Sequence, residues 1–236
     1  ICFFLLHFLG ILQIDKIVAQ IPSGANVNID LSETRLVGTT YMDYIVAISV
    51  YVKDTIVEKY NINPSKISVI NRGIDTNFLD NNTDQIDKNE LLHKFNIDRS
   101  KKIILFPARL TRWKGQLEFL DVVKKIDTNS ITVLFVGDTK NANYTKLVKE
   151  KIIKENLKDS CRILGNLDIN EMKCLYKIAD LSFSFPLRPE GFGRTISESL
   201  YSNTLVLAFN FGGVKNQLEN LNKIFKVDPL NYNNLH

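Results

Sequence analysis

Short runs of β-branched and other apolar residues alternate with longer amphipathic stretches along most of the chain. Uninterrupted apolar runs of this length are typical of buried strands, whereas apolar residues at spacings of three and four predict helices. The predicted strands are 44–49, 67–70, 103–106, 131–136, 162–164, 181–185, 205–209 and 224–227. The predicted helices are 50–60, 88–95, 115–126, 144–156, 170–179 and 195–201.

This alternation predicts an α/β fold in which helices cover both faces of a doubly wound parallel sheet, a Rossmann-like arrangement. In an open parallel sheet, the ligand crevice lies beyond the carboxyl ends of the strands. Residues that directly follow a strand are therefore the first candidates for chemistry.

A polar stretch rich in Asp and Asn, residues 80–90, is the best candidate for a linker. We therefore expect an N-terminal part at 1–80, a linker and lead-in at 81–101, and a Rossmann-like domain at 102–236. The apolar stretch 1–12 is shorter than the roughly 20 residues of a membrane helix, so a buried helix or strand is expected there. Because the first residue is Ile, we also expect the chain to be a fragment.

Composition narrows the class of protein. With 44% hydrophobic and 24% charged residues, the 236-residue chain is typical of a globular protein. The net charge of +4 is too small and too dispersed to indicate a nucleic-acid partner or more than peripheral contact with a membrane. The three cysteines and three histidines lack the spacings of metal ligands, so no metal is expected, and the cysteines fit a reducing, cytosolic setting.

Three cations follow the predicted strand 103–106, immediately before a predicted helix: Arg109, Arg112 and Lys114, with Gly115 next. Backbone N–H groups and the dipole at a helix N-terminus add to such charges and favour bound anions. The segment therefore indicates an anion site, although a solvated basic loop explains it equally well.

A second strand exit carries a sharper pattern. The segment from Glu190 to Gly193, Glu-Gly-Phe-Gly, follows the predicted strand 181–185, lies between two arginines and precedes a helix that contains Glu198. Glycines at such a junction let the backbone approach a ligand closely, so that diphosphate oxygens can accept main-chain N–H bonds. Two glutamates eight positions apart mean little by themselves, but together with the glycines they predict a phosphate site.

Taken together, these segments resemble the C-terminal half of the retaining glycosyltransferases of family 4, which have the two-domain GT-B fold. The resemblance depends on Arg109, on Lys114 with Gly115, and on the box in which Glu190 and Glu198 flank seven residues. Weaker matches occur in the same order as in that family, at residues 47–49, 69–75, 136–138 and 164–166. The resemblance implies that this chain contains the C-terminal half of a GT-B fold and a remnant of its N-terminal domain.

The implied activity is transfer of a sugar, with retention of configuration, from a nucleotide-diphosphate sugar to a polysaccharide or lipopolysaccharide precursor. By resemblance, Arg109, Lys114 and Glu190 are the catalytic residues, and the two cations stabilise the leaving diphosphate without a metal or other cofactor. The resemblance places Glu198 on the ribose and residues 164–166 on the base. The implied donor-binding residues are Gly115, Leu164, Gly165, Asn166, Gly191, Phe192, Gly193, Arg194 and Glu198.

The implied partners are a nucleotide sugar and a glycan or glycolipid acceptor, met in the cytoplasm or at the inner face of the cell membrane. Two departures from the family matter. Only the last strand and helix of its N-terminal domain fit before residue 75, so a separate chain is expected to supply the rest to an active enzyme. After Gly212 and Gly213, the chain has Val-Lys-Asn at 214–216 where the family usually has a Pro-Glu pair.

Three interpretations stay open. The first is an active glycosyltransferase that works with a partner chain, and the second is an inactive truncated fragment that retains only nucleotide-sugar binding. The third keeps the GT-B fold for another reaction, such as epimerisation or phosphorolysis, because a fold alone does not determine the reaction. Sugar transfer with release of a nucleoside diphosphate would separate the first from the other two.

Overall fold

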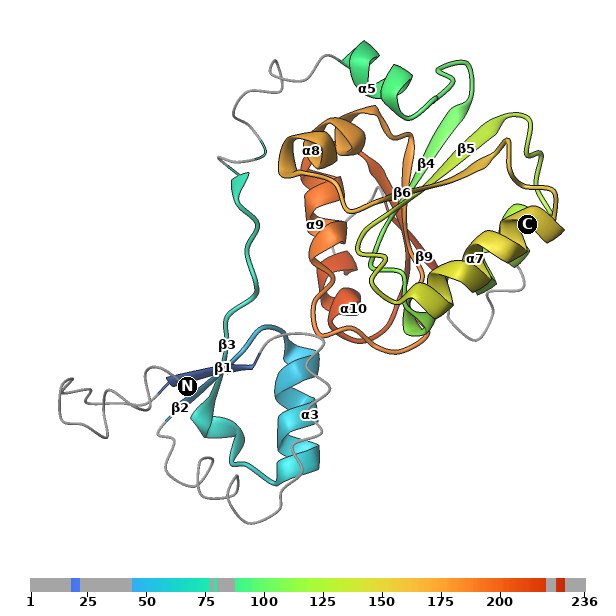
Figure 1. The fold of residues 1–236 in the computed structure, drawn as a ribbon. Coiled ribbons are helices and arrows are strands. Elements are labelled where there is room, and N and C mark those ends of the chain that lie inside the picture. The colour runs from blue at the N-terminus through green and yellow to red at the C-terminus, as the bar shows by residue number, and fades with distance from the viewer. Residues whose placement is uncertain (1–17, 22–43, 77–78, 80–87, 220–223, 228–236) are drawn as a thin grey trace, which may run out of the picture. The chain divides into compact units, whose positions relative to one another are not determined.

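The computed structural model describes residues 18–21, 44–76, 79, 88–219 and 224–227. The chain divides into two compact units, residues 1–72 and 73–236, each with its own sheet (Figure 1). The apolar stretch 1–12 and residues 81–87 of the expected linker lie outside the described residues. The expected domain limits, 1–80, 81–101 and 102–236, stay a prediction.

The first unit contains a parallel sheet in the order β1-β2-β3. Its strands are β1 (Val18–Ile21), β2 (Tyr44–Ala47) and β3 (Ile67–Val69). Helix α3 (Val50–Tyr60) connects β2 to β3, and a 3₁₀ turn, Pro64–Lys66, precedes β3. The helix begins after Ser49, whose side chain accepts a hydrogen bond of 3.1 Å from the Val52 N–H, so its first turn is capped as a helix start requires.

The second unit is built on a parallel sheet of six strands in the order β6-β5-β4-β7-β8-β9 (Figure 1). The strands are β4 (Lys102–Pro107), β5 (Ile131–Val136), β6 (Cys161–Gly165), β7 (Leu181–Ser184), β8 (Leu205–Phe209) and β9 (Ile224–Val227). From β4 the chain adds β5 and β6 toward one edge. It then returns to place β7 on the other side of β4 and adds β8 and β9 toward the opposite edge. This is the Rossmann order, in which the winding reverses beside the first strand.

Helices cover both faces of the larger sheet. They are α5 (Lys88–Lys94), α6 (Gln116–Val123), α7 (Ala142–Lys154), α8 (Ile169–Ile178), α9 (Arg194–Tyr201) and α10 (Gly213–Leu218). Helices α6 and α7 pack on one face, and α5, α8, α9 and α10 pack on the other. Figure 1 shows α7 on one side of the sheet and α8 and α9 on the other. Side chains alternate along a strand, so Ile104 and Phe106 of β4 face α6 and α7, whereas Ile103 and Leu105 face α5 and α8. Because both faces are covered, β4 is apolar and buried from Ile103 onward.

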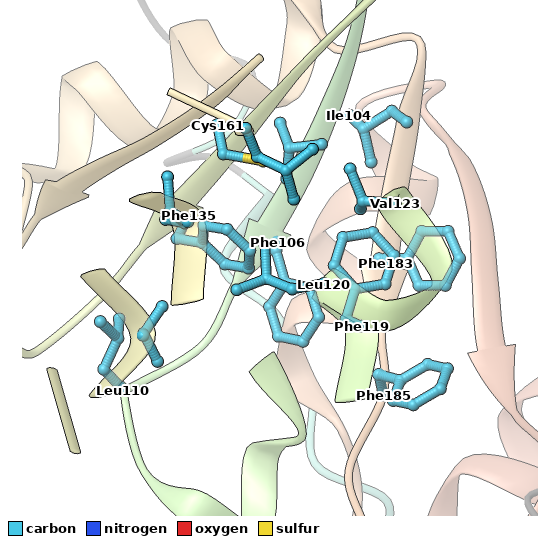
Figure 2. Packing of buried hydrophobic residues seen from close by; sticks show 14 of the residues in the cluster. Ile104, Phe106, Leu110, Phe119, Leu120, Val123, Phe135, Cys161, Phe183 and Phe185 are labelled. Carbon is cyan, nitrogen blue, oxygen red and sulfur yellow. The ribbon is translucent and has the colours of Figure 1, made fainter. Parts of the chain in front are cut away.

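Aromatic rings fill the face covered by α6 and α7 (Figure 2). The ring centroid of Phe119, on α6, lies 5.1 Å from that of Phe106, 4.4 Å from that of Phe183 and 6.1 Å from that of Phe185. The rings of Phe185 and Phe209 are 4.1 Å apart. Since Phe106, Phe185 and Phe209 lie at the carboxyl ends of β4, β7 and β8, the core holds these three strand exits in place.

The α/β, doubly wound, Rossmann-like fold expected from the sequence is confirmed. In the part of the chain that the structure describes, no helix is both long and apolar enough to cross a membrane.

Candidate functional site

The candidate site lies where the winding of the larger sheet reverses. Strands β4 and β7 are neighbours, but the chain continues from β4 toward one edge of the sheet and from β7 toward the other. In doubly wound folds, the carboxyl ends of such a strand pair are the place where ligands bind. The loops that follow these strands, residues 108–115 and 185–193, are the segments with the strongest sequence signals.

The two loops touch through their backbones. The loop after β4 ends in a 3₁₀ turn, Arg112–Lys114, followed by Gly115 with a φ of 77°. A Cβ atom on that glycine would lie 2.2 Å from the carbonyl oxygen of Phe185. Close by, the N–H of Leu187 donates a hydrogen bond of 2.7 Å to the carbonyl of Trp113. Glycine at position 115 therefore permits an approach that a side chain would prevent.

An ion pair also joins these loops. Lys114 Nζ contacts Glu190 Oε1, and the two side chains are only 18% and 10% exposed. The Trp113 ring also contacts the ammonium, since its centroid lies 4.3 Å from Lys114 Nζ in a cation–π contact. A cation and a carboxylate are thus held together where screening by water is weak.

Arg109 and Arg112 are placed differently from Lys114. Both are exposed residues, and Arg109 contributes its carbonyl oxygen, which accepts a hydrogen bond of 2.9 Å from Gln116 Nε2. Arg112 lies near Tyr144 on α7. Burial raises the pKa of that phenol to about 12, and the positive charge of Arg112 acts against the rise. Of the three cations expected at the anion site, Lys114 is the one held beside Glu190.

The loop from Glu190 to Gly193 takes its shape from the segment after β8. The Gly213 N–H donates a hydrogen bond of 2.7 Å to the Glu190 carbonyl, and a Cβ atom on Gly213 would lie 2.0 Å from the carbonyl oxygen of Gly191. Gln217 of α10 donates through Nε2 to the carbonyl of Phe192. The glycines after β8 therefore let two neighbouring loops pack backbone against backbone.

Glu198 lies in the second turn of α9, which begins after Gly193 with a φ of 89°. Its Oε1 is 2.7 Å from Nε of Arg194, and its Oε2 accepts a hydrogen bond of 2.8 Å from the hydroxyl of Tyr176 on α8. The Glu198 side chain is 18% exposed and that of Arg194 is 56% exposed. Arg194 is thus engaged with Glu198, four positions later on the same helix.

The segment expected to contact the base, Leu164–Asn166, ends β6 and is two strands away from β4. The Gly165 carbonyl accepts a hydrogen bond of 2.8 Å from the Gly137 N–H after β5. There, the Asp138 carbonyl accepts one of 2.9 Å from the Leu110 N–H after β4. Backbone hydrogen bonds therefore connect the exits of β6, β5 and β4.

Several buried polar atoms near these exits are unused. Within the described residues, four buried side-chain atoms have no hydrogen-bond partner: Thr111 Oγ1, Gln116 Oε1, Glu118 Oε2 and Asn210 Oδ1. Three of them lie in the loop after β4 or the first turn of α6, and the fourth follows β8. Because buried polar atoms normally have partners, their concentration here is consistent with a site that receives a polar ligand. The part of the chain that the structure describes contains no group of three or more His, Cys, Asp or Glu side chains that could hold a metal ion.

Comparison with known proteins identifies the family. The family described as Glycosyl transferases group 1 matches residues 87–236, well over half of the chain. The chain belongs to the group 1 glycosyltransferases. Among its relatives in this family, the O-antigen chain mannosyltransferase RfbU of Salmonella typhimurium is 30% identical over 167 residues, which cover 70% of this chain and 41% of RfbU. A trehalose synthase of Thermococcus litoralis is 25% identical over 204 residues, which cover 81% of this chain and 47% of the synthase.

Solved structures of glycosyltransferases agree with this assignment. A glycosyltransferase from Rickettsia africae has 31% identity and a TM-score of 0.76, over 90% of this chain and 56% of that one. HepE from Anabaena, solved in complex with UDP and glucose, has 20% identity and a TM-score of 0.76, over 91% and 58%, a likeness of fold alone. The likenesses support the expected GT-B type of fold. The chain spans about half the length of the curated relatives described here.

Two side chains that contact the site residues, Tyr176 and Gln217, are not predicted from the sequence. Tyr176 lies among the apolar positions of α8, so the sequence predicts a core residue there. The one indication of its contact with Glu198 is that a buried tyrosine hydroxyl usually has a hydrogen-bond partner. Gln217 lies on α10, a helix of six residues that has no detectable period. The glycine pair 212–213 is visible in the sequence, but its contact with residues 190–191 is not.

Proposed function

We propose that the protein transfers a sugar from a nucleotide-diphosphate sugar to a glycan or glycolipid acceptor. The observation that carries this proposal is the Lys114–Glu190 pair, at the reversal of the sheet winding and close to the first residues of α6 and α9. A cation, helix-terminal N–H groups and a glycine-lined backbone suit a diphosphate, and the adjacent carboxylate suits sugar hydroxyls. Membership of the group 1 glycosyltransferases supports the reaction type.

In this proposal, Lys114 stabilises the charge that develops on the leaving diphosphate as its bond to the anomeric carbon breaks. An ammonium has three N–H donors, so Lys114 can keep one on Glu190 and still donate to phosphate oxygens. The exposed Arg109 supplies a second cation. Pre-oriented donors of this kind are each worth about 2.7–4 kcal/mol in the transition state, and the proposal requires no metal.

The other residues of the site hold the donor. The second carboxylate oxygen of Glu190 accepts hydrogen bonds from the donor sugar, and Glu198 accepts them from the ribose. The backbone of Gly191–Gly193, together with Gly115, lies against the diphosphate. The backbone of Leu164–Asn166 contacts the base.

The acceptor is proposed to be a precursor of a cell-surface polysaccharide or lipopolysaccharide, and the transfer to retain configuration as in family 4. The relation to the O-antigen chain mannosyltransferase RfbU supports an acceptor of this class. The reaction then takes place in the cytoplasm, at the inner face of the membrane where a lipid-linked glycan is within reach.

Thermal unfolding of the 236-residue chain with UDP, GDP or ADP tests the donor site. A nucleotide at about 100 times its dissociation constant stabilises the folded state by about 2.7 kcal/mol, which raises the unfolding midpoint measurably. We expect one nucleotide to raise the midpoint and Lys114→Ala or Glu198→Ala to abolish the rise. Lys146→Ala is the matched control, because this lysine is exposed on α7 beside Glu150. No rise with any nucleotide in a cooperatively unfolding chain would contradict the donor site.

Sugar transfer needs a second measurement. The chain is incubated with nucleotide sugars and membranes that contain lipid-linked glycans, and release of nucleoside diphosphate is followed. NMR of the product then gives the configuration at the new glycosidic bond. Nucleotide binding without release under any acceptor or partner condition would leave nucleotide-sugar binding as the function, and an inverted product would exclude retention.

A further inference from the structure

Both carboxylate oxygens of Glu198 are held by neighbouring side chains. Arg194 approaches Oε1 from one turn earlier in α9, with its Nε 2.7 Å away. The hydroxyl of Tyr176, on α8, donates a hydrogen bond of 2.8 Å to Oε2. Because the two donors come from different helices, together they determine the orientation of the carboxylate as well as its position.

These two contacts differ in strength. The Arg194 side chain is 56% exposed, and an ion pair in contact with water is worth little. Tyr176 is only 3% exposed. Burial, reinforced by the negative charge of Glu198, raises the pKa of the Tyr176 phenol well above its usual value, so its hydroxyl stays protonated. The stronger of the two contacts to Glu198 is therefore the hydrogen bond from Tyr176.

Tyr176 is itself held firmly. Its carbonyl accepts a hydrogen bond from Thr204 Oγ1, just before β8, and its ring belongs to the core under α8. The first turn of α8 is closed by a capping box between Asp168 and Glu171. The hydroxyl is thus positioned by a packed helix rather than by a loop.

The carboxylate keeps unused acceptor positions. An ionised carboxylate can accept about four hydrogen bonds, and Arg194 and Tyr176 occupy one on each oxygen. The Glu198 side chain is 18% exposed, so a ligand can reach the remaining positions. Two hydroxyl groups on adjacent carbons, as in a ribose, match a carboxylate of fixed orientation.

We propose that Tyr176 is a positioning residue for ribose recognition, whose hydroxyl orients Glu198 so that the carboxylate accepts hydrogen bonds from the 2′- and 3′-hydroxyls of the donor nucleotide. This inference rests on the proposed function, in which Glu198 binds the ribose. A tyrosine that served only as core would do equally well as phenylalanine. Removing the hydroxyl alone, in Tyr176→Phe, therefore tests the proposal.

The experiment compares two ligands by isothermal titration calorimetry: UDP, GDP or ADP, whichever raises the unfolding midpoint most, and the 2′,3′-dideoxy form of the same nucleotide. The wild-type chain is expected to prefer the ribonucleotide by at least about tenfold, since hydrogen bonds to a charged group are involved. In Tyr176→Phe, we expect this preference to fall by about two- to tenfold while affinity for the dideoxy form is unchanged. Glu198→Gln should remove most of the preference.

Tyr201→Phe is the matched control, because it removes a tyrosine hydroxyl at the far end of α9, from an exposed residue. Its ligand preference should equal that of the wild type. An unchanged preference in Tyr176→Phe, with the preference lost in Glu198→Gln, overturns the positioning role and leaves the proposed function standing. Equal weakening of both ligands in Tyr176→Phe makes the role structural and also overturns it. If the wild-type chain binds neither ligand, the proposed function fails and this inference fails with it.

Discussion

At the scale of single residues, the Lys114–Glu190 pair is costly as well as useful. Both side chains have little exposure, so each loses solvation that its attraction to the other must offset. An apolar pair of similar size would hold the loops together at least as well. The pair is therefore better explained by a function at this position than by a contribution to stability.

Gly115 is subject to two constraints, which other glycines of the chain allow us to test separately. Gly115 has a φ of 77° and no room for a Cβ, Gly165 has a φ of 76° with open space, and Gly73 has neither constraint. We expect Gly73→Ala to change the free energy of unfolding by less than about 1 kcal/mol and Gly165→Ala to lower it by about 1–2 kcal/mol. Gly115→Ala should cost more than either and abolish nucleotide binding. Urea unfolding measures these differences, and equal costs at 115 and 165 would argue against the close approach to Phe185.

The sequence predicts Lys114, Glu190 and Glu198 as site residues because each is close to a strand exit or to glycines. It does not indicate that Lys114 contacts Glu190, 76 positions later, because that contact depends on β7 pairing with β4. The Tyr176–Glu198 hydrogen bond depends in the same way on how α8 packs beside α9. The functional roles of the three charged residues stay a prediction.

At the scale of elements, α8 shows how local capping supports the site. The Asp168 carboxylate accepts hydrogen bonds of 2.8 Å and 2.9 Å from the N–H groups of Asn170 and Glu171. Glu171 accepts one of 3.0 Å from the Asp168 N–H and forms an ion pair with Lys94 of α5. The start of the helix that carries Tyr176 is therefore fixed by the reciprocal contacts of Asp168 and Glu171 and by an ion pair to α5.

Removing the cap should loosen this helix in particular. Asp168→Ala is expected to lower the free energy of unfolding by about 1 kcal/mol, because the first-turn N–H groups lose their acceptor. Hydrogen exchange should accelerate in residues 169–171. Helix α7 is the internal control, since its own cap, Asn141, accepts a hydrogen bond from the Tyr144 N–H. Faster exchange in α7 to the same degree would mean that the effect is not local.

Most helices and strands of the described part of the chain are predicted from the sequence. The limits of α3, β5, β8 and β9 agree with the predicted ones, and those of the other predicted elements differ by one to three residues. One strand, β1, and one helix, α10, are not predicted. The six residues of α10 are too few to show the helical period. Helix α6 ends three residues before its predicted limit, where the chain turns.

At the scale of the whole molecule, aspartates connect distant segments of the larger unit. Asp180, before β7, accepts a hydrogen bond of 2.9 Å from the Ile103 N–H of β4 and pairs with Lys102 at 2.9 Å. Asp121 of α6 lies 2.7 Å from Lys151 of α7. Burial acts to raise the pKa of both carboxyl groups, but these hydrogen bonds and cations outweigh it and lower both pKa values.

The lowered pKa values predict sensitivity to acid. A carboxyl group with a lowered pKa in the folded state stabilises that state above its unfolded pKa, about 3.9 for Asp, and loses this contribution as pH falls through the folded pKa. We expect the free energy of unfolding to be steady from about pH 7 to pH 5 and to fall below about pH 4. Urea unfolding across this range measures it. Asp180→Asn should be less stable at neutral pH and show a shallower fall, and an undiminished fall would assign the effect to other carboxyl groups.

The strand order has a further consequence while the chain is being synthesised. When β6 has left the ribosome, β6, β5 and β4 can already form half of the larger sheet, but the partner of β4 on its other side, β7, is still to come. The apolar β4 is then an open edge, the kind of surface that invites pairing with other chains. A growing chain therefore passes through a stage in which this edge can pair with another chain. That stage ends when β7 pairs with β4, the same pairing on which the contact between Glu190 and Lys114 depends.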